Sequence, residues 1–166
     1  MRLASFEAIA GALQTAEVRY LVAGGLAVNA HGYLRFTKDV DLVVQLDPDN
    51  IRRALVALGG LGYRPAIPVT VEQFADPAQR EQWIREKNMQ VFQLWSDSHI
   101  ETPIDVFVSE PFEFNTEYAS AVVKPLRDDL MVPFVTIPTL IRMKQLANRD
   151  QDRIDIEHLR MRLADE

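Results

Sequence analysis

Three aspartates stand among apolar residues, where a carboxylate needs a specific partner. Asp39 directly precedes the segment 40–46 and Asp41 lies within it. This segment is apolar except for Asp41 and Gln45, which predicts a buried strand. Because side chains alternate along a strand, both carboxylates point to one face. They would repel each other and be costly to desolvate, and a divalent cation between them removes both problems. The alternative is that Asp39 lies in a loop, while Asp41 pairs with an arginine or is solvated at a strand end.

Asp105 is a lone acid in a second apolar segment, residues 103–108. If this strand lies next to 40–46, three carboxylates converge, which is enough for a site with two metal ions. The chain has no cysteine, and its three histidines lack the paired spacing of zinc ligands. The carboxylates are therefore the expected ligands, and a hard divalent cation is the expected metal.

Groups suited to phosphate lie near the acidic pair. Gly24 and Gly25 connect a short apolar segment, 18–23, to a helical one, 26–30, so a ligand can approach the backbone at the start of a helix. Arg35, Thr37 and Lys38 directly precede Asp39, and cations with a hydroxyl beside carboxylates suit a triphosphate bridged to metal. The alternatives are an ordinary tight turn and a polar loop that neutralises its own aspartates.

The elements that must position these residues alternate between strands and helices. This pattern predicts an α/β (α+β) fold, with a mixed sheet flanked by helices and with helices at the C-terminus. Residues 64–82 read as a variable connection with some helix near its end. The expected strands are 18–23, 40–46, a hairpin of 89–95 with 103–108, and an extended segment at 131–137; the expected helices are 5–16 (Ser5 as N-cap), 26–30, one from Pro48 to about 58 after an Asp47 cap, 138–147 and 151–163.

Length and composition place the chain among ordinary globular proteins. It has 166 residues, 48% of them hydrophobic and 25% charged, which fits one domain over 1–166, with a core at about 1–110 and a C-terminal strand and helices at about 130–166. No apolar stretch reaches the length of a membrane span, so no membrane partner is expected. The lack of cysteine and of a signal-peptide pattern fits the cytoplasm. The net charge of −6 provides no bulk basic field for nucleic acid.

The combined pattern resembles the nucleotidyltransferase superfamily, which shares the DNA polymerase β-like fold. The resemblance is carried by a strand, Gly24-Gly25, a short helix, Asp39-Val40-Asp41-Leu42 fourteen positions after Gly25, and a later strand aspartate, Asp105. The surrounding residues are most similar to small bacterial members, the AbiEii-type toxins and their uncharacterised relatives. The C-terminal run from Met143 to Leu159 also resembles that branch, so the resemblance covers residues 18–45, 103–108 and 138–160.

This resemblance implies an enzyme that moves a nucleoside monophosphate (NMP) from an NTP, such as ATP, to an acceptor hydroxyl and releases pyrophosphate. It implies that Asp39 and Asp41 bind Mg²⁺, with Mn²⁺ as a substitute, and that Asp105 completes the second metal site and helps deprotonate the acceptor. It also implies that Gly24 and Gly25 cradle phosphate, supported by Arg35, Thr37, Lys38 and Lys144.

Helical periodicity places Lys144 beside the packed face of helix 138–147 and Asp155 beside that of helix 151–163. Two interpretations stay open. In one, Lys144 reaches the nucleotide phosphates and Asp155 positions Lys144 or Arg149. In the other, Lys144 forms a salt bridge between the two helices.

The sequence does not distinguish among three acceptors: an RNA end, a small molecule and a protein. If the protein belongs to the toxin-like branch, a toxin or antitoxin partner is expected. Clustering of seven basic residues around the site would favour RNA: Arg2, Arg19, Arg35, Lys38, Arg142, Lys144 and Arg149. The alternative function is a non-catalytic nucleotide- or partner-binding module that retains the fold.

Overall fold

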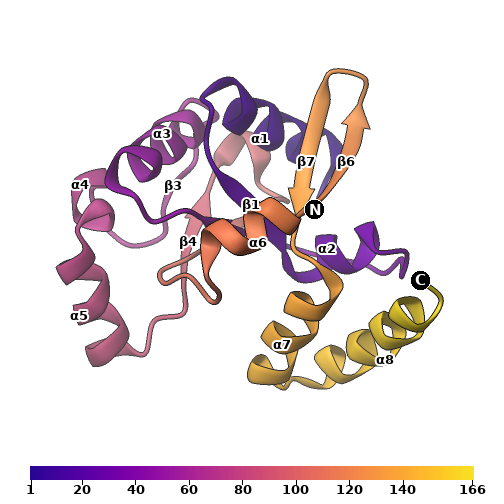
Figure 1. The fold of residues 1–166 in the computed structure, drawn as a ribbon. Helices are drawn as coiled ribbons and strands as arrows, with labels where there is room; N and C mark the ends of the chain where they lie inside the picture. Colours follow the sequence, from indigo (N-terminus) through magenta and orange to yellow (C-terminus); the bar gives the residue numbers. More distant parts are fainter.

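A seven-stranded mixed sheet forms the centre of the molecule in the computed structural model, which describes residues 1–166 (Figure 1). The strand order is β3-β4-β5-β2-β1-β7-β6. β2 and β5 are parallel, as are β1 and β7, and the other neighbouring pairs are antiparallel. The strands are β1 (Tyr20–Ala23), β2 (Val40–Val44), β3 (Arg64–Pro65), β4 (Val91–Trp95), β5 (Ile104–Phe107), β6 (Val122–Arg127) and β7 (Leu130–Phe134).

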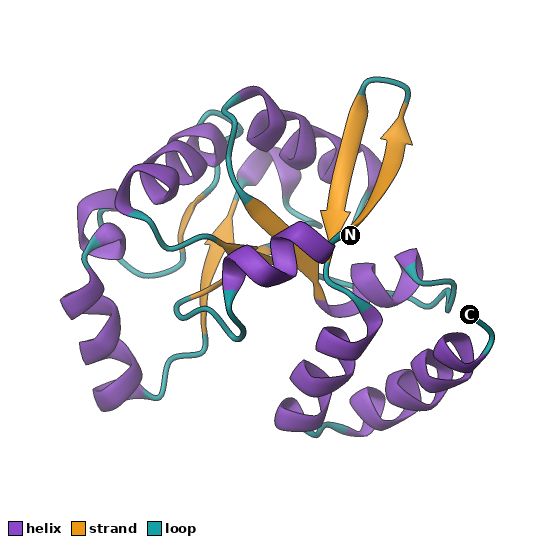
Figure 2. Cartoon of the chain, in the orientation of Figure 1, coloured by secondary structure: helices purple, strands orange, loops and turns teal.

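Eight α-helices surround this sheet (Figure 2). α1 packs on α3 and β7, α4 lies between α3 and α5, and α7 packs on both α8 and α2. The β6–β7 hairpin extends away from the rest of the sheet (Figure 1). The helices are α1 (Leu3–Thr15), α2 (Gly24–Ala30), α3 (Pro48–Gly59), α4 (Val71–Ala75), α5 (Pro77–Lys87), α6 (Phe114–Ser120), α7 (Ile137–Ala147) and α8 (Asp150–Ala164), with a short 3-10 helix at Asp97–His99.

The central strands are apolar because they are buried on both faces. All four residues of β1 are buried, and so are four of the five residues of β2, with Asp41 the partly exposed one. They belong to a core cluster of 38 buried residues that also includes the inner faces of α1, α3 and α7. No helix of the chain is both long enough and apolar enough to cross a membrane.

The α+β class with a mixed sheet is confirmed, and so are the elements around the aspartates. Segments 89–95 and 103–108 form the expected antiparallel hairpin, as β4 and β5. The Asp47 side chain caps α3 by accepting hydrogen bonds from the amides of Asp49 and Asn50, with Pro48 in the first turn.

The prediction of Ser5 as an N-cap is wrong. Arg2 occupies the cap position of α1 without a side-chain hydrogen bond, and its amide donates to the hydroxyl of Thr102. Ser5 lies inside the helix, buried, with its hydroxyl 2.9 Å from Nδ1 of His99. The start of α1 thus makes a long-range contact, with Thr102, that no local pattern encodes.

The connection 64–82 is more ordered than expected. It contains strand β3 and helix α4, and α5 begins within it. Both helices carry local start signals: Thr70 and Gln73 form a capping box, and Asp76 caps α5 ahead of Pro77.

Helix α6 and strand β6 were not predicted. β6 is a mostly exposed edge strand containing Lys124 and Pro125, so it lacks the apolar alternation of a half-buried strand.

Candidate active site

Asp41 and Asp105 lie side by side on neighbouring strands. They are register partners in the parallel pair β2 and β5, and Ala23 of β1 is the partner of Asp41 on its other side. Partners in register face the same side of a sheet about 5 Å apart. Asp39 comes just before β2, in a bend, and is partly buried. The sheet therefore joins aspartates that are 64 positions apart in sequence, as the expected adjacency of the two strands required.

The protein does not neutralise this group of carboxylates with a salt bridge. Nearby salt bridges use Asp152 and Asp155 instead. Burial raises the pKa of Asp41 to about 7, with further contributions from Asp105 and Asp39, against a smaller opposing effect of Lys144 and Arg149. Burial also raises the pKa of Asp105, helped by Asp39 and opposed by a hydrogen bond from Gln93. The pairing of Asp41 with an arginine is thus not observed.

The chemistry of these donors fits a hard divalent cation, since carboxylate oxygens are its preferred ligands and the positive charge would offset the repulsion. No group of three or more Asp, Glu or His side chains is close enough to hold a metal ion by itself. Asp41 and Asp105 are adjacent, and Asp39 lies within electrostatic range of both. Asp41 and Asp105 are therefore the adjacent pair that could share a cation, and Asp39 does not complete a group of three with them.

The Gly24-Gly25 turn is packed by side chains of the site. Gly24 has a φ of 61°, and a Cβ atom there would lie 1.9 Å from Oδ2 of Asp41. A Cβ atom on Gly25 would lie 2.5 Å from the hydroxyl oxygen of Thr37. Both glycines therefore make room for Asp41 and Thr37, and this is a physical reason for the pair beyond the turn itself.

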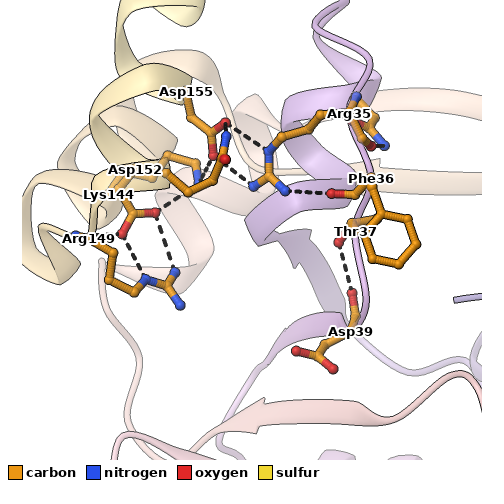
Figure 3. Close-up of polar contacts among 10 residues, drawn as sticks. Arg35, Phe36, Thr37, Asp39, Lys144, Arg149, Asp152 and Asp155 are labelled. Carbon is orange, nitrogen blue, oxygen red and sulfur yellow. Dashed lines mark hydrogen bonds and ion pairs between the residues drawn. The ribbon is translucent and has the colours of Figure 1, made fainter.

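The loop between α2 and β2 presents alternate residues to the protein and to solvent. Arg35, Thr37 and Asp39 are partly buried, whereas Lys38 is exposed and Phe36 is 80% exposed. Figure 3 shows Arg35 reaching the C-terminal helices while Thr37 and Asp39 continue toward β2. The loop thus carries Arg35 and Thr37 on the side of Asp39 and directs Lys38 outward.

Asn29 of α2 fixes the backbone of this loop. Its side-chain amide donates to the carbonyl of Arg35 and accepts from the amide of Arg35, each at 3.0 Å. Sequence reasoning missed Asn29, although an asparagine near a helix end is a residue type that often bonds the backbone.

Arg35 and Lys144 converge on one buried carboxylate. Arg35 donates to both oxygens of Asp155, at 2.8 and 2.7 Å, and Lys144 lies 2.6 Å from Oδ2 of Asp155 (Figure 3). Lys144 is 4% exposed and Asp155 is 0% exposed. The predicted salt bridge between the two helices is therefore confirmed, and it extends to the loop that carries Asp39.

A second buried acid, Asp152, was missed. It lies 3.2 Å from Nζ of Lys144, and it accepts hydrogen bonds from the backbone amide and the guanidinium of Arg149. Arg149 is therefore held by Asp152 and not by Asp155, which corrects one of the two predicted assignments. Asp152 lies three residues after Arg149, at the start of α8, and this capping position is the local signal that could have identified Asp152.

The seven basic residues do not gather into a free patch. Arg2 pairs with Glu101, and Arg19 lies over the rings of Phe114 and Tyr118 at the other end of β1 from the Gly24 turn. Arg142 bonds Thr139, and Arg35, Lys144 and Arg149 are engaged with Asp155 and Asp152. Only Lys38 is exposed without such a partner, so the seven residues do not form the free cluster that would favour an RNA acceptor.

Gln93 and Trp95 of β4, neither of which the sequence indicated as a site residue, extend the site. Gln93 is the register partner of Asp105 and donates to its Oδ1 at 3.2 Å. The indole N–H of Trp95 donates to the side-chain carbonyl of Gln93 at 3.0 Å. Asp41, Asp105 and Gln93 therefore form one row across three strands, with Trp95 beside its end.

Comparison with solved structures identifies the fold. The lincosamide antibiotic adenylyltransferase LnuA, bound to lincomycin, has a TM-score of 0.54 at 12% identity, covering 89% of each chain. ANT(2")-Ia, in complex with adenylyl-2"-tobramycin, also has a TM-score of 0.54, at 13% identity, covering 95% of this chain and 86% of that one.

An antigenic nucleotidyltransferase-like protein from Paracoccidioides brasiliensis matches at the same TM-score of 0.54 with 16% identity, covering 95% of this chain and 74% of that one. No protein-family model and no curated protein matches the sequence. At these identities the likeness establishes the nucleotidyltransferase fold alone.

Proposed function

We propose that the protein is a metal-dependent nucleotidyltransferase that moves an NMP group from an NTP, such as ATP, to a hydroxyl of a small-molecule acceptor and releases pyrophosphate. The observation that carries the proposal is the adjacent pair Asp41 and Asp105, without a salt bridge, beside the Gly24 turn of a nucleotidyltransferase fold. A structural role would leave two neighbouring, repelling carboxylates unexplained.

Asp39, Asp41 and Asp105 are the residues that would hold Mg²⁺, or Mn²⁺ in its place. When bound, the metal would neutralise the triphosphate and the charge that develops on the attacking and leaving oxygens. On the β1 side, Gly24, Gly25 and Thr37 are the proposed phosphate contacts, and Arg35, Lys38 and Lys144 supply positive charge. Arg35 and Lys144 would do so while held by Asp155, which keeps both cations close to the site.

In the proposed reaction the acceptor oxygen bonds to the α-phosphorus of the NTP. The bond from that phosphorus to the oxygen bridging to the β-phosphate breaks, and pyrophosphate leaves with the electron pair. Asp105 would take the proton of the acceptor hydroxyl. Burial raises the pKa of Asp105, which favours such a proton acceptor over an ordinary surface carboxylate.

Two observations favour a small molecule as the acceptor. Six of the seven basic residues that could serve an RNA end are engaged by other side chains, which leaves only Lys38 free. Among the proteins with a similar fold, two are antibiotic adenylyltransferases that were solved with lincomycin or with adenylylated tobramycin.

The direct test is calorimetric titration of each NTP, with and without Mg²⁺, into the wild type and the Asp41→Asn variant. We expect Mg²⁺-dependent binding in the wild type and its loss in the variant, with an unchanged circular dichroism spectrum. The preferred NTP would then be tested for transfer to lincomycin and tobramycin. Unchanged turnover in Asp41→Asn, for whichever acceptor reacts, would refute the site.

A non-catalytic nucleotide-binding module is the second candidate. It is favoured by the engagement of Lys144 with two buried carboxylates, which leaves this lysine fewer donors for phosphate. Metal-dependent NTP binding without turnover in a broad acceptor screen would support it. Membership of a toxin–antitoxin pair, which the resemblance to AbiEii-type toxins implies, stays a prediction from the sequence. Growth arrest on expression of the wild type but not of Asp41→Asn would support it.

A further inference from the structure

The two sides of the carboxylate pair differ in what lies next to them. In the strand order β4-β5-β2-β1, the Gly24 turn lies beyond Asp41, whereas Gln93 and Trp95 lie beyond Asp105. The glycine turn, Thr37 and Arg35 are all on the β1 side. An acceptor that approaches Asp105 without crossing the proposed phosphate site must therefore lie over β4.

Trp95 is held at that position with its ring partly open. Side chains two residues apart on a strand share a face, so Trp95 shares the face of Gln93 and Asp105. Its side chain is accessible, at 37% exposure, compared with 6% for Trp83, the only other tryptophan. An indole N–H is only a donor and a carboxylate only an acceptor, so the amide of Gln93 can satisfy both neighbours in one orientation.

Resting on the proposed function, we infer that the acceptor is a hydroxylated ring compound whose apolar ring face stacks on Trp95, while Gln93 anchors the indole beside Asp105. Aromatic side chains with one fixed polar atom suit such recognition, because the ring supplies contact area and the hydrogen bond sets its orientation. Because β4 runs antiparallel to β5 and β2 runs parallel to it, Trp95 and Asp39 both lie near the start of β5. The backbones of Trp95 and Asp39 are about 10 Å apart there, which is two strand spacings.

The test uses Trp95 as its own reporter. In a Trp83→Phe background, Trp95 is the only tryptophan, and phenylalanine keeps an aromatic ring against Phe74 and Phe92. This protein, saturated with Mg²⁺ and α,β-methylene ATP, which cannot release pyrophosphate, is titrated with methyl β-D-glucopyranoside and with benzyl alcohol as ring probes. Glycerol is the ring-free control.

We expect a saturable change in Trp95 emission with a ring probe and none with glycerol. In the otherwise wild-type chain, Trp95→Ala should weaken binding of that probe at least tenfold by calorimetry, whereas Trp95→Phe should retain it. Both variants should bind Mg²⁺ and α,β-methylene ATP as the wild type does. Gln93→Leu in the Trp83→Phe background should shift the emission of Trp95 before any probe is added. It should also weaken binding of the ring probe.

Three results would overturn the inference while leaving the proposed function intact: nucleotide binding with no response to either ring probe, an equal response to glycerol, or unchanged binding of the ring probe in Trp95→Ala. A wild-type chain that binds neither the natural NTPs nor the methylene analogue would remove the proposed function, and with it this inference. Titration of the wild type with nucleotide alone separates the two failures.

Discussion

Two regions of this molecule bury aspartates in opposite ways. Between β2 and β5, Asp41 and Asp105 lie side by side without a salt bridge, and burial with repulsion from neighbouring aspartates raises the pKa of both. Between α7 and α8, burial would raise the pKa of Asp155 and Asp152, but hydrogen bonds from Arg35, Lys144 and Arg149 outweigh it and lower the pKa of both. In the helical region each acid is paired with a cationic side chain, whereas the two acids in the sheet have no salt-bridge partner.

This difference separates positioning from chemistry. The paired acids fix α7, α8 and the loop after α2, so their charges stabilise the fold. The unpaired acids cost stability, which is typical of functional sites, and in the proposed function a cation and a substrate would offset that cost. The following experiments test that separation, beginning with the largest expected effect.

Asp155→Ala should destabilise the protein by about 3–5 kcal/mol, because it leaves Lys144 and Arg35 without their buried partner. Urea unfolding measures the loss. The matched control is Glu157→Ala in the same helix, at an exposed position, which should change the free energy of unfolding by less than about 0.5 kcal/mol. Equal effects of the two substitutions would show that the network does not stabilise the fold.

Gly24→Ala should cost about 2 kcal/mol and abolish Mg²⁺-dependent nucleotide binding. Alanine is strained at a φ of 61°, and its Cβ atom would displace the carboxylate of Asp41. Gly11→Ala, in the middle of α1, is the control and should not destabilise the protein. A Cβ atom there meets nothing within 4 Å, and alanine is a better helix former than glycine. A Gly24→Ala protein with normal nucleotide affinity would contradict the close packing of the turn on Asp41.

Asp41→Asn should do the opposite of Asp155→Ala and stabilise the protein, by about 1–2 kcal/mol at pH 8, while it abolishes transfer. The variant removes a charge that burial and two neighbouring carboxylates disfavour. Urea unfolding of this variant is compared with Asp128→Asn, an exposed aspartate that should change stability little. A destabilised Asp41→Asn protein would mean that Asp41 has a structural partner.

The sequence allowed prediction of what adjacent residues encode. Apolar neighbours of Asp41 and Asp105 indicated two buried strands, and the later hairpin indicated that a mixed sheet would form. Helical periodicity also indicated that Lys144 and Asp155 border the packed faces of their helices, where they meet.

What could not be predicted depends on contacts between distant positions. Gln93 gains its role only because β4 pairs with β5, which brings it opposite Asp105. Arg35 was expected at phosphate, but it binds Asp155, which is 120 positions away. Helix α6 contributes Glu117, which accepts from the amide of Thr136 and the hydroxyl of Thr139 at the start of α7, and no periodic pattern in its own segment reveals that contact.

The dependence of stability on pH should show the two regions as opposite slopes in separate ranges. The folded pKa of Asp41, about 7, lies above its unfolded value, so its stabilising contribution is complete at low pH and is lost as the pH rises through 7. The pKa values of Asp152 and Asp155 are lowered, so their contribution is present above about pH 4 and is lost as the pH falls below that value.

Between pH 5 and 7 the free energy of unfolding of the wild type should fall by about 1 kcal/mol relative to Asp41→Asn, because partial solvent contact reduces the full linkage. Urea unfolding across this range, with and without Mg²⁺, measures the difference. A cation that binds the ionised carboxylates should reduce the decline in the wild type and leave Asp41→Asn less affected, whereas a decline that Mg²⁺ does not change would show that these aspartates do not hold the metal.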